Sequence, residues 1–116
     1  MDYKIKSRIW IESEQGVFLG EGRVNLLKAI AETGSLSKAA RLLKMSYKKA
    51  WNLLDSMNKG AGEPLVITST GGKGGGGASL TPYGKKVIEV FDQINQKCWE
   101  FLDNELKQIS LQSSIK

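Results

Sequence analysis

Residues 34–60 read GSLSKAARLLKMSYKKAWNLLDSMNKG and contain two helical patterns separated by a short break. The first pattern begins after Ser35, a favourable N-cap residue, and its apolar positions recur at three- and four-residue steps until about Lys44. Ser46 is the next N-cap, and the second helix is expected over residues 47–58. Two adjacent alanines in the first helix allow a close crossing after so short a turn. These features predict a helix-turn-helix.

The flanking sequence adds one helix before this motif and a hairpin and a helix after it. Residues 23–33 have a helical period, and Gly34 supplies the left-handed residue that ends such a helix. Residues 65–70 are rich in β-branched side chains and predict a strand, and residues 78–80 predict its return strand after a glycine tract. A threonine N-cap followed by proline then starts a helix expected over residues 81–111.

The N-terminal residues predict a further hairpin. From Lys4 to Glu12 apolar and polar side chains alternate, with Ile5, Ser7, Ile9 and Ile11 on one face, which predicts a half-buried strand; residues 17–19 can pair back on it. The expected fold class is α+β, a winged helix-turn-helix with an N-terminal β-hairpin and a long C-terminal dimerisation helix. The expected divisions are N-terminal strands (1–20), the winged helix-turn-helix (21–80, with its wing at 64–80), the dimerisation helix (81–112) and a tail (113–116).

The residue types present exclude several classes of site. The chain has no His and a single Cys, Cys98, so it offers no Cys/His zinc site, no His-based triad and no disulfide. We therefore expect no enzyme activity, no metal and no cofactor. Absence of disulfides suits a reducing cytoplasm, where we expect the protein. No apolar run approaches the roughly 18–20 residues of a membrane span, so we expect no membrane partner.

Positive charge is concentrated in the helix-turn-helix. The formal net charge is +5, and residues 35–60 alone hold six Lys or Arg residues against a single Asp. Residues 1–34 and 81–116 each hold five basic and five acidic side chains. A basic surface of this kind is expected of a protein that binds a phosphate backbone. A solvated helical face is the alternative explanation of the charge alone.

We expect the second helix of the motif to enter the major groove of double-stranded DNA. Lys48 and Lys49 lie in its first turn, and Asn52, one turn on, has the donor and acceptor that can read adenine. Tyr47 and Trp51 each have two explanations, namely DNA contact or packing between helices. The serines are helix caps first and phosphate ligands second. The candidate DNA-binding residues are Ser35, Ser37, Lys38, Ser46, Tyr47, Lys48, Lys49, Trp51, Asn52, Thr70 and Lys73.

The glycine tract GGKGGGG occupies residues 71–77. It does not match a phosphate-binding P-loop, because Lys73 is followed by Gly74 instead of Ser or Thr and the next helix does not start at once. Glycine-rich backbone amides together with the Lys73 charge suit a DNA phosphate. A flexible linker is the alternative.

Several of these segments resemble the DNA-binding domain of the ModE family, the bacterial molybdate-responsive transcriptional regulators. The resemblance is carried by Ser46-Tyr47-Lys48-Lys49-Ala50-Trp51, by Asp55-Ser56-Met57-Asn58 and by the tract from Gly71 to Ala78. Residues 34–40 and 80–84 fit the same pattern and are also similar to the LysR-type helix-turn-helix. The resemblance covers roughly residues 20–100 and implies a DNA-binding winged domain with a long helix that helps to form a dimer. It includes no counterpart of the family's molybdate-binding domains, so we expect no molybdate binding by this chain.

The last helix is longer than a small winged domain can cover. About 28 residues at ~1.5 Å per residue give roughly 42 Å. Its apolar side chains continue to the far end and need a partner, which a two-fold homodimer would supply. The candidate dimerisation residues are Ile94, Cys98, Phe101, Leu102 and Leu106. The sequence thus favours a dimeric, sequence-specific DNA-binding transcriptional regulator; a winged-helix protein-interaction module and a small-anion sensor that uses the glycine tract are the alternatives.

Overall fold

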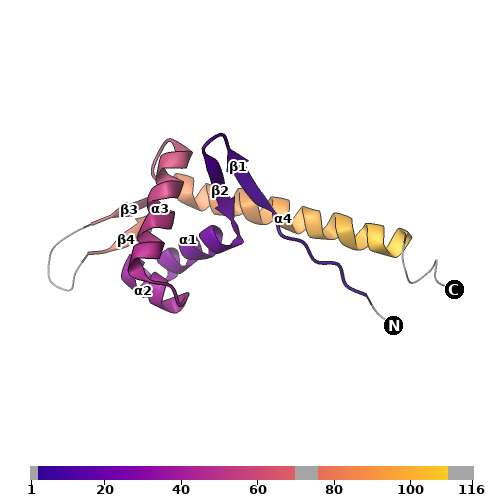
Figure 1. The fold of residues 1–116 in the computed structure, drawn as a ribbon, viewed down its shortest axis with the longest axis horizontal. Coiled ribbons are helices and arrows are strands. Elements are labelled where there is room, and N and C mark those ends of the chain that lie inside the picture. The colour runs from indigo at the N-terminus through magenta and orange to yellow at the C-terminus, as the bar shows by residue number, and fades with distance from the viewer. Residues whose placement is uncertain (1–2, 70–75, 110–116) are drawn as a thin grey trace.

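The structure is a computed structural model that describes residues 3–69 and 76–109 of the 116-residue chain. In these ranges the elements are, in order, β1 (Trp10–Ser13), β2 (Gly16–Gly20), α1 (Glu21–Thr33), α2 (Leu36–Leu42), α3 (Tyr47–Ala61), β3 (Val66–Thr68), β4 (Ala78–Leu80) and α4 (Pro82–Gln108). Helices α1, α2 and α3 gather into one body, from which α4 extends (Figure 1). The expected α+β fold with an N-terminal hairpin, a helix-turn-helix, a wing and a long last helix is confirmed.

The helix-turn-helix forms where its capping residues predict it. The Oγ atom of Ser35 accepts a hydrogen bond from the backbone N–H of Lys38 at 3.1 Å, which caps α2. The Oγ atom of Ser46 does the same for α3, accepting from the backbone N–H of Lys49 at 3.0 Å. Each cap satisfies one of the N–H groups that a helix start leaves without an intrahelical partner.

The ends of α2 and α3 differ slightly from the prediction. Helix α2 stops two residues before Lys44, because Lys44 adopts the left-handed conformation (φ 57°) and turns the chain. The backbone N–H of Met45 then donates to the carbonyl of Ala40 at 3.0 Å. Helix α3 runs three residues beyond its predicted end, to Ala61, where Gly62 (φ 77°) terminates it.

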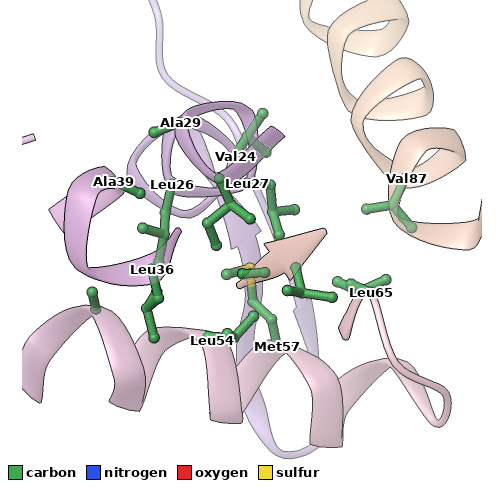
Figure 2. Close-up of a cluster of buried hydrophobic side chains, with 14 of the residues drawn as sticks. Val24, Leu26, Leu27, Ala29, Leu36, Ala39, Leu54, Met57, Leu65 and Val87 are labelled. Carbon is green, nitrogen blue, oxygen red and sulfur yellow. The ribbon is translucent and has the colours of Figure 1, made fainter. Parts of the chain in front are cut away.

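The hydrophobic core lies between α1, α2 and α3. Figure 2 shows Val24, Leu26 and Leu27 of α1 on one side of the cluster and Leu54 and Met57 of α3 on the other. These side chains are buried, and three of them are completely so. The alanines expected at the helix crossing are buried too. The rest of the core consists of Leu19, Ala29, Ile30, Leu36, Ala39, Ala40, Ala50, Leu65, Val66, Ala78, Val87 and Phe91.

The wing hairpin, β3 and β4, starts one residue later than predicted. The strand expected over residues 65–70 begins at Val66, because the backbone of Leu65 bonds elsewhere. The N–H of Leu65 donates to Oδ1 of Asn58 in α3 at 2.8 Å, and its carbonyl accepts from the N–H of Thr81 at 2.9 Å. Leu65 therefore ties the base of the wing to both α3 and the start of α4.

The return strand of the wing is held against the helix-turn-helix. The N–H of Ala78 donates to the carbonyl of Gly34, in the turn between α1 and α2, at 2.9 Å. Within the wing, the N–H of Ser69 donates to the carbonyl of Gly77 at 2.9 Å. Both described ends of the wing are thus anchored beside the start of α2.

The N-terminal strand is shorter than its alternation predicts. The expected strand over residues 4–12 is wrong for residues 4–9, since β1 starts at Trp10. Its partner β2 is short, and the last residue of β2, Gly20, already faces Trp10. The chain then enters α1, so residues 4–9 have no neighbouring strand with which to form a ladder.

Residues 3–9 form an N-terminal arm that lies beside α4. The Oγ atom of Ser7 is 3.7 Å from the Sγ atom of Cys98. Ser7 and Ile9 are half-buried, as the alternating pattern predicts, but Ile5 of the same predicted face is exposed. The arm therefore keeps the two-residue periodicity of a strand for part of its length without belonging to a sheet.

Helix α4 starts at the base of the wing in very close contact with it. The Oγ1 atom of Thr81 accepts from the N–H of Gly84 at 2.9 Å and donates to the carbonyl of Pro64 at 2.8 Å. A Cβ atom on Gly84 would overlap the carbonyl oxygen of Leu65. Only glycine allows the backbones of α4 and the wing to approach this closely.

Only the first ten residues of α4 contribute buried side chains to the core, among them Val87 and Phe91. No later residue of the helix is buried in the part of the chain that the structure describes. The helix ends at Gln108 and Ile109 is its C-cap, so the expected helix over residues 81–111 is wrong at Ile109. The predicted tail at residues 113–116 lies outside the described residues. Among the described residues, no helix is long and apolar enough to cross a membrane.

Candidate nucleic-acid interface

Helix α3 presents one polar face and buries the other. Ala50, Leu54 and Met57 point into the core. Every candidate DNA-binding residue that sequence analysis placed on this helix is exposed. They are Tyr47, Lys48, Lys49, Trp51 and Asn52. Helix α3 therefore forms a ridge on the surface, with its buried face packed on α1 and α2.

A hollow, named here the wing-side hollow, runs along one side of this ridge. It lies between the start of α2, the start of α3 and the base of the wing, so it brings together elements that are distant in sequence. Trp51 and Tyr47 line it with 49% and 55% of their surface exposed, which leaves both rings accessible beside the wing. The lining residues are Ser35, Leu36, Ser37, Tyr47, Trp51, Thr68, Ser69, Gly76 and Gly77.

A second open hollow, named here the α1-side hollow, lies along α3 as well. Its lining residues are Arg23, Ser46, Lys48, Lys49, Asn52 and Leu53. Arg23 comes from the first turn of α1 and is half-buried, and its Nη1 donates to Oγ of Ser56 at 3.0 Å. The sequence alone does not indicate this position, because only the packing of α1 against α3 shows that Arg23 faces the interface.

The serine candidates have the structural roles expected of caps. Ser35 and Ser46 use their Oγ atoms to cap α2 and α3. Ser37 and Lys38, in the first turn of α2, are exposed. This helix start therefore presents a hydroxyl and an ammonium group to the solvent beside the wing-side hollow.

The basic side chains of residues 35–60 are all on the surface. One of them, Lys59, is paired with Asp55 at 2.9 Å. The other five form no ion pair with any residue that the structure describes; they are Lys38, Arg41, Lys44, Lys48 and Lys49. An uncompensated positive surface thus covers α2, the turn and the start of α3, and it favours an anionic partner.

Two predicted DNA-binding residues of the wing, Thr70 and Lys73, lie outside the described residues. The described part of the wing ends at Ser69 on one side and resumes at Gly76 on the other. Within the described ranges, no group of three or more His, Cys, Asp or Glu side chains is placed to hold a metal ion.

The candidate dimerisation residues lie on the part of α4 that extends from the body. Ile94 and Phe101 are exposed, Phe101 with 62% of its surface accessible. Cys98, Leu102 and Leu106 are half-buried. Trp99, which is not among the candidates predicted from the sequence, is exposed and lines a hollow between α1, α4 and the N-terminal arm.

Comparison with known proteins identifies sequence relatives. The family model for bacterial regulatory helix-turn-helix proteins of the lysR family matches residues 22–85. The chain is 43% identical over 109 residues to the transcriptional regulator ModE of Yersinia pestis, covering 90% of this chain and 41% of that protein. It is 42% identical over 98 residues to the DNA-binding transcriptional dual regulator ModE of Escherichia coli K12, covering 82% of this chain and 37% of that protein. The expected resemblance to ModE is confirmed, and the chain spans about two fifths of the length of these relatives.

A solved structure supports the fold. The structure of a CbnR_DBD-DNA complex superposes with a TM-score of 0.57 at 19% sequence identity, covering 76% of this chain and 95% of that chain. At this level of identity the likeness concerns the arrangement of helices and wing.

Proposed function

The chain belongs to the bacterial regulatory helix-turn-helix proteins of the lysR family, and on this premise we propose that it is a transcriptional regulator that binds double-stranded DNA as a homodimer. One observation carries the proposal. Helix α3 exposes Lys48, Lys49 and Asn52 together, and the two lysines have no carboxylate partner among the described residues. A helix-turn-helix with such a face is suited to the major groove.

In this proposal α3 lies in the groove and the elements beside it hold the backbone. Asn52 can accept and donate to adenine, and Lys48 can donate to guanine. Ser37 and Lys38 at the start of α2 contact phosphates, where a hydroxyl donor and a positive charge favour an anion. The glycine tract with Lys73 follows β3 in the chain, and in this proposal it binds a phosphate of the DNA backbone beside the groove.

The homodimer is supported by the exposed apolar side chains on α4. The helix has 27 residues, so its length is about 40 Å at ~1.5 Å per residue. Its exposed apolar side chains, Ile94 and Phe101 among them, continue well past the core. A second copy packed on this face would present two α3 helices to two half-sites on one side of the duplex.

The proposed function is tested by selecting DNA fragments with the purified protein at about 150 mM salt, where non-specific phosphate binding is weakened. We expect enrichment of a two-fold symmetric motif. Changing Lys48 and Lys49 together to Ala should weaken binding and lower the salt dependence of log Kd by about 1 to 2 per chain. Binding that is equally strong in this variant would refute the assignment of α3, and no binding by the wild type would favour a protein or small-anion partner.

A further inference from the structure

The α1-side hollow concentrates positive charge from two helices. Arg23 of α1 and Lys48 and Lys49 of α3 line it, and none of its lining residues is acidic. The nearest carboxylates in the sequence are already paired elsewhere. Glu21, two residues before Arg23, lies 3.5 Å from Arg8, and the α3 carboxylate Asp55 is paired with Lys59.

The guanidinium of Arg23 is held in place but not neutralised. Its hydrogen bond to Oγ of Ser56 at 3.0 Å fixes the side chain against α3. Arg23 forms no ion pair with any residue in the described ranges. An arginine has five N–H donors in a planar fork, so most of them stay free for a ligand. A cation without a counter-ion favours the approach of an anion.

The two hollows lie on opposite flanks of α3. With Lys48 taken as the centre of the exposed face and about 100° per residue, Asn52 lies about 40° and Lys49 about 100° to one side. Trp51 lies about 60° to the other side, toward the wing. A helix in the major groove has a phosphate backbone on each rim of a groove about 12 Å wide. The wing-side hollow can face one rim and the α1-side hollow the other.

We propose that the α1-side hollow binds a phosphate of the DNA backbone on the rim opposite the wing, with Arg23 as its principal ligand. The proposal rests on the proposed function, since it requires α3 to enter the major groove. The Arg23 fork donates two parallel hydrogen bonds to the phosphate oxygens, and Lys49 adds its charge beside them. Lys48 and Asn52, nearer the centre of the ridge, are left to meet base edges.

The test measures binding to a fluorescent double-stranded DNA of random sequence, because a phosphate contact does not depend on sequence. Kd is determined between about 50 and 200 mM salt for the wild type, Arg23→Gln and Arg23→Lys. Arg23→Gln should lower the slope of log Kd against log salt by about 0.9 per chain, so that the loss of affinity over this range is about 3.5-fold smaller. Arg23→Lys keeps the charge and should keep most of the slope.

Lys28→Gln is the matched control. It removes the same charge from the same helix, but Lys28 faces α4, where it pairs with Asp92 at 3.0 Å. Its slope should equal that of the wild type. Thermal melting of Arg23→Gln and Ser56→Ala is measured as well, since the Arg23 to Ser56 hydrogen bond also joins two helices.

The outcomes separate the proposals. If Arg23→Gln melts at a lower temperature but keeps the wild-type slope, Arg23 is only a structural brace and the phosphate site is refuted, while the proposed function stands. The phosphate site is refuted as well if Arg23→Gln and Lys28→Gln lower the slope equally, since the effect is then one of net charge. If the wild type does not bind DNA at all, both proposals fail together.

Discussion

Replacing Asn58 by Ala removes the side chain that joins α3 to the base of the wing, and we expect the free energy of unfolding to fall by about 1.5 kcal/mol. Oδ1 of Asn58 accepts from the N–H of Leu65 at 2.8 Å and lies 3.4 Å from the N–H of Val66. Both of these residues are buried, so water cannot readily replace the lost acceptor. Leaving a buried N–H unpaired costs about 1–3 kcal/mol. The higher helix propensity of Ala returns about 0.5 kcal/mol of this.

The measurement is thermal unfolding followed by circular dichroism at a fixed protein concentration. For a chain of this size, 1 kcal/mol corresponds to about 4 °C, so we expect a decrease of about 6 °C. Asn52→Ala is the matched control, because it makes the same change in the same helix at an exposed residue whose side chain forms no hydrogen bond with any residue in the described ranges. Asn52→Ala should melt at or slightly above the wild-type temperature but lose DNA affinity. An Asn58→Ala protein as stable as Asn52→Ala would refute the reasoning.

Two further predictions concern α4. Gly84→Ala should lower the free energy of unfolding by about 1–3 kcal/mol in a thermal melt, because the new Cβ overlaps the carbonyl oxygen of Leu65. Gly22→Ala is the control. Its Cβ meets no atom within 4 Å, so this variant should not be destabilised. Phe101→Asp should convert the proposed dimer to a monomer in sedimentation velocity, whereas Gln96→Asp on the opposite side of the helix should not. A wild type that sediments as a monomer would contradict the dimer.

Local signals in the sequence predict the helix-turn-helix well. Ser35, Ser46 and Thr81 each cap the helix that they were expected to cap, because a cap involves only a residue and its neighbour three positions on. The strand expected over residues 4–12 fails for the opposite reason. Alternation reports which side chains face a surface, but a ladder also needs a partner strand, and β2 is too short to provide one.

In the candidate site, too, features that depend on local sequence are predictable and features that depend on tertiary packing are not. The exposed face of α3 is predictable from helical periodicity, since the residues opposite the apolar stripe face the solvent. Arg23 and Asn58 are not predictable in this way. Each side chain forms a hydrogen bond to a residue outside its own helix. Arg23 of α1 donates to Ser56 of α3, and Asn58 of α3 accepts from Leu65 at the base of the wing. Their roles depend on how α1, α3 and the wing pack together.

The hydrogen bonds of Arg23 and Asn58 show why the orientation of α3 depends on residues outside its exposed face. On one side the helix is bonded to α1 through Arg23 and Ser56, and on the other it is bonded to the wing through Asn58 and Leu65. Leu65 is also the residue against which Gly84 sets the start of α4. Leu65 therefore contacts both α3 and the start of α4, and it helps to set the orientation of each helix. A change at Leu65 should alter the relative orientation of α3 and α4 as well as stability, whereas a change at Lys48 or Asn52 should alter DNA affinity and base preference without a loss of stability.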